Sequence, residues 1–160
     1  NSIEDLSNVE HSEQSNSDIK VSGLGLIPVN TKFEINKSLE KITKRSLWPI
    51  KEELSGFELH HGRSHPVDSS TKKINKIFED SKLGWVIEEK PSVCIAGTYM
   101  HGIFDNGKWR RAWINIIREK KGLRKLSINT PDYSNERERL INKLTDAFNE
   151  HINLDLLLEK

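Results

Sequence analysis

Residues 97–106 of this chain (GTYMHGIFDN) contain one histidine, His101, and follow directly on a short apolar run, Val93 to Ala96. This pattern predicts a buried strand that presents one imidazole at its carboxyl end. Open α/β sheets gather ligands and catalytic groups at that end of their strands. His101 could accept and donate protons near neutral pH, and we take it as the main catalytic candidate. From spacing alone, a histidine that only satisfies loop hydrogen bonds is the alternative.

Three further histidines, at positions 60, 61 and 65, flank Gly62 and Arg63. Adjacent histidines on a strand point to opposite faces, and no carboxylate or cysteine lies at a metal-ligand spacing. We therefore predict no metal site here. Arg63 would instead supply a fixed positive charge to a loop that contacts a polar or anionic substrate.

Cys94, the only cysteine, is a poor candidate for a nucleophile that acts with His101. Seven residues of extended strand span roughly 23 Å at about 3.3 Å each, and their odd separation places the two side chains on opposite faces. We expect Cys94 to be a small core residue. A single cysteine allows no internal disulfide, which fits a reducing cytoplasm.

The elements that position these residues divide the chain into three parts. Residues 1–22 are rich in Ser, Asn, Glu and Asp and predict a loop, whereas residues 23–104 predict mainly strands and loops and residues 108–160 mainly helices. The expected strands cover 24–29, 54–60, 84–87 and 93–99, and the segment 31–51 is ambiguous.

Two helices are expected in the last part. Apolar residues recur at helical spacing from Trp109 until Gly122, which is a plausible stop. We expect Asp105-Asn106-Gly107 to turn the chain and cap this helix. A second amphipathic face begins near a capping box formed by Asn135 and Glu138, and residues 155–159 could add a final turn.

The overall composition bounds the class of protein. The 160 residues suffice for one domain with a real core, although only 34% are hydrophobic and 31% are charged. A net charge of +1 gives no electrostatic case for nucleic acid. The sequence contains no apolar run of about eighteen residues, so we expect no membrane span. No signal peptide is visible. We expect a cytoplasmic α/β protein with a mixed-sheet sandwich.

Four segments resemble the C-terminal class I glutamine amidotransferase domain of the cobyric acid synthase family. Residues 23–28 (GLGLIP) are similar to the family's G-L-G-L-L-P, and residues 56–64 (GFELHHGRS) to its G-Y-E-I-H-x-G-R-T. Residues 97–106 match G-T-Y-x-H-G-x-F-D-N, and residues 151–158 (HINLDLLL) match E-H-L-D-L-D-x-L. The resemblance implies a flavodoxin-like sheet, incomplete at its N-terminus.

The resemblance implies a specific reaction. A cysteine thiolate attacks the side-chain amide of glutamine, and a histidine, which aligns with His101, serves as its base. Many class I amidotransferases add an acid in an H-x-E arrangement, but Ile103 occupies that position here. The resemblance also places a set of substrate-binding candidates beside the glutamine pocket: Glu58, His60, Gly62 and Arg63. The other reading of this set is strand-end packing with Arg63 at a domain interface.

The family's nucleophile turn, G-x-C-G-G-x-Q-x-x-G, does not occur in this sequence. By resemblance, Asn1 falls just after it, and the synthetase domain that would use ATP and Mg²⁺ is also absent. We therefore expect a fragment that is inactive and folds poorly alone. The resemblance implies that it belongs to an enzyme that amidates four carboxylates of a corrinoid, adenosylcobyrinic acid a,c-diamide. The alternative is a non-catalytic binding or scaffolding remnant. The residues after Asp105 disfavour a third reading, a cell-wall amidase partner.

Overall fold

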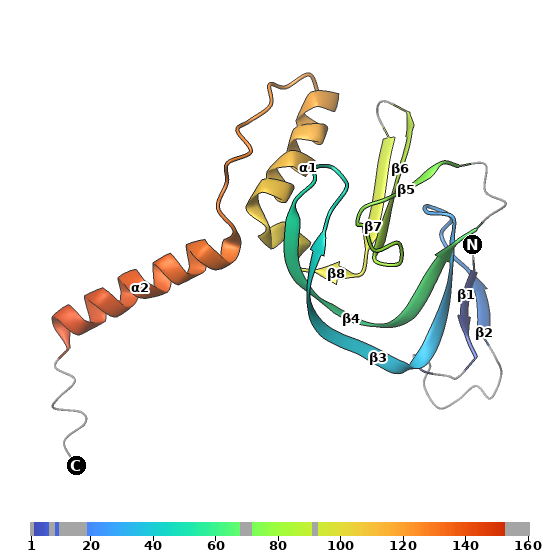
Figure 1. The fold of residues 1–160 in the computed structure, drawn as a ribbon, viewed down its shortest axis with the longest axis horizontal. Helices are drawn as coiled ribbons and strands as arrows, with labels where there is room; N and C mark the ends of the chain where they lie inside the picture. Colours follow the sequence, from blue (N-terminus) through green and yellow to red (C-terminus); the bar gives the residue numbers. More distant parts are fainter. Residues whose placement is uncertain (1, 7–8, 10–18, 68–71, 91–92, 153–160) are drawn as a thin grey trace, which may run out of the picture.

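A computed structural model of the chain describes residues 2–6, 9, 19–67, 72–90 and 93–152 (Figure 1). The elements, in chain order, are β1 (Ser2–Asp5), β2 (Ile19–Ser22), β3 (Val29–Arg45), β4 (Glu53–Pro66), β5 (Ile74–Lys76), β6 (Gly84–Lys90), β7 (Val93–Thr98), β8 (Met100–His101), the short 3₁₀ helix η1 (Ile103–Asp105), α1 (Gly107–Lys120) and α2 (Tyr133–His151).

The strands form two sheets. The larger has the order β2-β1-β3-β4-β8, and only β1 and β3 run parallel in it. The smaller sheet, β5-β6-β7, is antiparallel throughout. The predicted α/β class with a mixed sheet is confirmed, and it is consistent with a class I glutamine amidotransferase domain of the flavodoxin-like type.

The long hairpin of β3 and β4 curves around the smaller sheet (Figure 1). The register between its strands shifts between Phe33 and Ser38, and such irregularities bend and twist a strand pair. The main core lies where this hairpin, the smaller sheet and α1 meet. Its buried residues are Ile42, Leu54, Ile77, Phe78, Leu83, Val86, Met100, Ile103 and Trp109.

The prediction of a loop over residues 1–22 is wrong where the structure describes it. β1 pairs with β2 on one side and with β3 on the other, because backbone hydrogen bonds can recruit polar sequences into a sheet without an apolar pattern. The strand expected at 24–29 is also wrong. Gly25 adopts a φ of 71°, and the chain bends until β3 begins at Val29. The ambiguous segment 31–51 is mostly strand.

The first predicted helix is confirmed, and Gly122 follows its end with a φ of 68°. Asn106 is the N-cap residue, but its side chain makes no capping bond to the helix. Asp132 performs that role from a distance, since its Oδ1 accepts the Gly107 backbone N–H at 2.6 Å. A carboxylate at this position also complements the positive end of the helix dipole.

The second helix begins at Tyr133, two residues before the predicted capping box. Asn135 therefore lies inside α2 and not at its cap. The helix extends away from both sheets (Figure 1), and its apolar residues Leu140, Leu144 and Phe148 are exposed. The further turn predicted at 155–159 lies outside the described residues. Neither helix that the structure describes is long and apolar enough to span a membrane.

Candidate active site

His101 ends the short strand β8, which pairs with β4 at the edge of the larger sheet. Its cross-strand partner is Phe57, and the two rings stack with centroids 5.0 Å apart and planes 10° from parallel. The His101 side chain is exposed, and neither ring nitrogen has a hydrogen-bond partner among the described residues. Ile103, at the position of the acid in H-x-E sites, is buried in the core. The ring is thus held by its face, and its nitrogens are open to a ligand.

The backbone around His101 is fixed by close approaches to β4. A Cβ on Gly56 would lie 2.7 Å from Met100 Cγ and would also collide with the His101 carbonyl oxygen. Gly102 takes a φ of 76°, which turns the chain sharply into η1. Asn106 then binds Ser55 twice, accepting its N–H and donating to its carbonyl, both at 3.0 Å. These contacts join the start of α1 to β4 and leave β8 little freedom.

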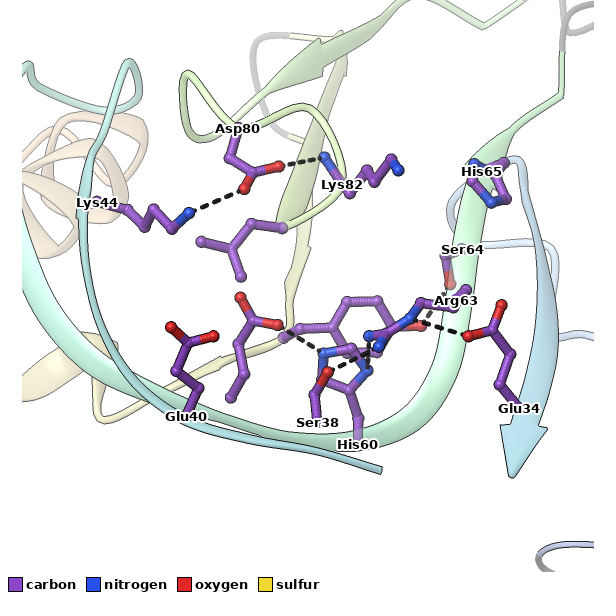
Figure 2. A pocket seen from close by; sticks show the side chains of 13 residues that line it. Glu34, Ser38, Glu40, Lys44, His60, Arg63, Ser64, His65, Asp80 and Lys82 are labelled. Atoms are coloured by element: carbon purple, nitrogen blue, oxygen red, sulfur yellow. Dashed lines mark hydrogen bonds and ion pairs between the residues drawn. The ribbon is translucent and has the colours of Figure 1, made fainter. Parts of the chain in front are cut away.

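The opposite, concave face of the β3–β4 hairpin lines a polar cavity of about 530 Å³ (Figure 2). The loop between β5 and β6 forms its far wall. The cavity's polar lining residues are Glu34, Ser38, Glu40, Lys44, Glu58, His60, Arg63, Ser64, His65, Asp80, Lys82 and Tyr99. Among the described residues, no group of three or more His, Cys, Asp or Glu side chains could hold a metal ion.

Three contacts fix the His60 ring in this cavity. Its Nδ1 donates to the Gly62 carbonyl at 2.6 Å, and its Nε2 lies 3.1 Å from Glu58 Oε2. Its ring stacks on Tyr99 with centroids 3.9 Å apart. A Cβ at Gly62 would lie 3.0 Å from Thr31 Cγ2 and 3.2 Å from the Tyr99 hydroxyl, so only a glycine fits without displacement. Both ring nitrogens of His60 therefore have partners within the fold.

Arg63 extends this network along the cavity floor, as Figure 2 shows. Its Nη2 donates to Ser38 Oγ at 2.8 Å, and its Nε lies 3.4 Å from Glu34 Oε2. Next to it, the Ser64 hydroxyl lies 2.5 Å from the Tyr99 hydroxyl. The network thus joins residues of β3 and β4 to the segment that precedes His101.

The far wall of the cavity carries a second ion pair. Lys44 Nζ donates to Asp80 Oδ2 at 3.1 Å, and the Lys82 backbone N–H donates to Asp80 Oδ1 at 3.1 Å. The Lys82 N–H is the main cause that lowers the pKa of Asp80, and Lys44 adds to it against the opposing effect of burial. Asp80 therefore stays charged and holds Lys44 across the cavity from His60.

The structure separates the predicted site residues into two groups. Glu58, His60, Gly62 and Arg63 come together as a bonded cluster, and His101 lies with Phe57 on the other face of β4. The sequence analysis missed Phe57 and Tyr99. A period of two along 56–60 already assigns Phe57 to the face opposite Glu58 and His60. This period does not show that Phe57 packs against His101, which follows only from the pairing of β8 with β4.

Cys94 lies on β7, in a different sheet from His101. Burial in apolar surroundings raises the pKa of its thiol, outweighing the opposite effect of Lys120. A raised thiol pKa disfavours the thiolate, which is the nucleophilic form. The prediction that Cys94 is a packing residue agrees with this geometry, although the residue is half-buried and not fully enclosed.

Comparison with known proteins places this chain in a family. Residues 1–109 match the model of the CobB/CobQ-like glutamine amidotransferase domain. The chain belongs to the CobB/CobQ-like glutamine amidotransferase family. The match takes in both faces of β4, β8 and His101, and it ends inside α1.

Individual relatives agree with the family match. The chain is similar to proteins named cobyric acid synthase from Prochlorococcus marinus (strain SARG), at 46% identity over 98% of the chain, and from Synechococcus sp. (strain CC9311), at 42% identity over 86%. It covers 31% and 28% of these two relatives. This CobB/CobQ-like chain thus spans less than a third of the length of either protein.

Proposed function

We propose that this chain supplies His101 as the proton-transfer residue of a glutamine-hydrolysing site. The observation that carries the proposal is the exposed, face-stacked imidazole of a CobB/CobQ-like domain, whose nitrogens have no partner among the described residues. A base must reach the proton that it abstracts, and an imidazole already engaged in the fold could not do so.

In the proposed reaction, the thiolate of a cysteine outside this chain attacks the side-chain carbonyl carbon of glutamine. His101 takes the thiol proton and passes it to the departing ammonia, leaving a thioester. Water then hydrolyses the thioester, giving glutamate and the free thiol. Cys94 does not act as this nucleophile, because it lies in the other sheet and its thiol pKa is raised.

Phe57 takes part of the role that an acid has in H-x-E sites. A carboxylate would fix the ring through one nitrogen, whereas Phe57 fixes it through its face and leaves both nitrogens available. Stacked aromatic pairs are worth about 0.5–1.5 kcal/mol beyond area burial, which is enough to favour one ring orientation.

We also propose that the concave cavity with Glu58, His60 and Arg63 contacts a polar substrate group. Its mixed charges suit a small molecule that carries both an amine and a carboxylate. Because these residues lie on the face of β4 opposite His101, the group they bind is not the amide whose hydrolysis His101 assists.

The names of the relatives support a wider proposal for the longer protein. It would pass ammonia to carboxylates of a corrinoid, adenosylcobyrinic acid a,c-diamide, after activation by ATP with Mg²⁺ bound outside this chain. Relatives named cobyric acid synthase are the basis for this assignment.

A chimaera tests the role of His101. The matched segment of the Prochlorococcus marinus (strain SARG) relative is replaced by this chain, and amidation is measured with glutamine or with high ammonium. His101→Ala should lower the glutamine-dependent rate by about 10²–10⁴-fold and spare the ammonium-dependent rate. His151→Ala, an exposed histidine in α2, is the matched control and should change neither rate.

Two outcomes oppose the proposal. Glutamine-dependent activity that survives His101→Ala would remove the assigned role of this histidine. A chimaera that uses ammonium but never glutamine, with a nucleophile turn intact, would favour a non-catalytic remnant.

A further inference from the structure

A second pocket, of about 290 Å³, lies where the end of β4 meets β5 and the start of β6. This side pocket adjoins the polar cavity and shares Ser64, His65 and Lys82 with it. The two spaces differ in charge, because acidic side chains line the polar cavity but none of the side pocket's described lining residues is acidic. The residues that line the side pocket are Ser64, His65, Pro66, Ile74, Lys76, Ser81, Lys82 and Trp85.

Two lysines bring permanent positive charge to the side pocket. Lys76 comes from β5 and Lys82 from the loop between β5 and β6, and neither ammonium group forms a hydrogen bond or an ion pair with a described residue. The charge of Lys82 does act on Asp80, but the Asp80 oxygens already bind Lys44 and the Lys82 backbone N–H. In Figure 2 the Lys82 side chain extends away from Asp80, toward the side on which His65 lies. Both ammonium groups are therefore available to an anion.

Trp85 adds a hydrogen-bond donor and an apolar wall to the side pocket. Its side chain is only 5% exposed, yet its indole N–H has no hydrogen-bond partner among the described residues. Every fully buried side-chain nitrogen and oxygen in that part of the chain has a partner, so this N–H reaches open space. The indole N–H of a buried tryptophan usually finds an acceptor. An unused donor beside two unpaired ammonium groups therefore indicates a site for an anionic acceptor.

We propose that the side pocket binds the phosphate group of a small phosphate monoester, whose apolar part packs on Pro66, Ile74 and Trp85. A phosphate monoester carries nearly two negative charges at neutral pH and has three strong acceptor oxygens. It would compensate both lysines, which bind phosphate as point charges, whereas a single carboxylate would leave one lysine uncompensated. The inference rests on the charge and the unused donors of this pocket, and it does not depend on the role of His101.

The indole N–H of Trp85 reports on this site directly. The chimaera described above is labelled with ¹⁵N-tryptophan, Trp85→Phe identifies the Trp85 resonance, and phenyl phosphate is the probe. We expect phenyl phosphate to shift this resonance with saturation, and benzoate and inorganic phosphate to bind about tenfold more weakly, because each lacks part of the matching charge or apolar surface. Phosphate bound at a distant nucleotide site would leave this resonance unchanged.

Three results of this titration would overturn the proposal. They are an unchanged Trp85 resonance with phenyl phosphate, equal affinity for benzoate, which would indicate a carboxylate site, and equal affinity for inorganic phosphate, which would remove the apolar part of the ligand.

A lysine substitution separates a specific site from general electrostatic attraction. Lys76→Gln removes one of the two charges and should raise the Kd of phenyl phosphate about fivefold. Lys73→Gln is the matched control, because Lys73 is an exposed lysine nearby that does not line the pocket, and it should leave the Kd nearly unchanged. If both substitutions raise the Kd equally, the pocket only attracts anions through its overall charge and the proposal fails.

A carboxylate placed in the side pocket gives an independent measurement that keeps Trp85 and both lysines. Ser81 is exposed, so the fold should tolerate Ser81→Glu and its neutral match of similar size, Ser81→Gln. Calorimetric titration of the chimaera with phenyl phosphate should show about tenfold weaker binding for Ser81→Glu than for Ser81→Gln. Equal binding by the two variants would contradict the proposal. Neither readout uses glutamine hydrolysis, so each stands even if the role of His101 fails its own test.

Discussion

The two faces of β4 carry two chemically different arrangements built from adjacent residues. On one face, Phe57 stacks on His101, and both side chains are open to solvent. On the other, Glu58 and His60 belong to a bonded network that lines a cavity. The first arrangement leaves its imidazole nitrogens unengaged within the described part of the chain, whereas the second engages both nitrogens of His60.

This difference separates the histidine that we propose as the proton-transfer residue from the histidine whose nitrogens the fold engages. Both residues are histidines in glycine-containing motifs near a sheet edge, so residue type does not distinguish them. What distinguishes them is the number of partners that the fold supplies. A histidine whose nitrogens are satisfied inside the fold contributes to stability and to cavity shape, and one whose nitrogens are free can move a proton to a ligand.

The largest expected effect on stability comes from removing His60 from the hydrogen-bonded network that lines the cavity. His60→Ala removes the contacts to Glu58 and Gly62 and the stacking on Tyr99, and it leaves a carboxylate and a carbonyl without their partner. We expect a loss of about 1–3 kcal/mol in the free energy of unfolding, measured by urea denaturation. His101→Ala should cost less, at most about 1 kcal/mol, because the exposed side chain loses only its stacking on Phe57. Equal losses would show that the two faces are not different in this way.

An intermediate effect is expected on the open face. Phe57→Leu keeps an apolar side chain but removes the ring that stacks on His101. Loss of about 1 kcal/mol of orientation corresponds to a roughly fivefold fall in kcat for glutamine, with KM unchanged. Phe57→Tyr should retain the rate, since it keeps the ring. A fall in KM and kcat together for both variants would contradict an orienting role.

The smallest effect concerns the far wall of the cavity. The pKa of Asp80 is lowered in the folded state, so its contribution to stability is present above the unfolded pKa and is lost as pH falls through the folded pKa. Asp80→Asn should therefore destabilise the chain near neutral pH, by less than about 1 kcal/mol because the pair is partly exposed. The difference in the free energy of unfolding between the Asp80→Asn variant and the unchanged chain should disappear in strong acid. Urea midpoints across pH give the measurement, and a gap independent of pH would rule out this charge effect.

Local patterns predicted several elements correctly. The helical spacing after Trp109 and the stop at Gly122 correspond to α1. The apolar run before His101 does form a strand, β7, but its Cys94 and Ile95 are only half-buried, and the strand ends at Thr98. His101 is not at its carboxyl end, as predicted, but on β8 in the other sheet. Local patterns failed where long-range pairing decides the conformation. β1 is a strand because β2 and β3 flank it, and the cap of α1 comes from Asp132, which is 25 residues away from Gly107. Neither partner is visible in a window of neighbouring residues.

Residue identity was enough to assign the family and the single histidine of the 97–106 motif, and the period of two along a strand already sets Phe57 apart from Glu58 and His60. The face of β4 that meets His101 depends instead on how the chain packs. The strand breaks at Tyr99, so that Tyr99 stacks on His60 while His101 pairs with Phe57. A regular strand would have placed residues 99 and 101 on one face. The bend between the two sheets places Tyr99 and His101 on opposite faces of β4. Tyr99 packs there against His60, and His101 packs against Phe57.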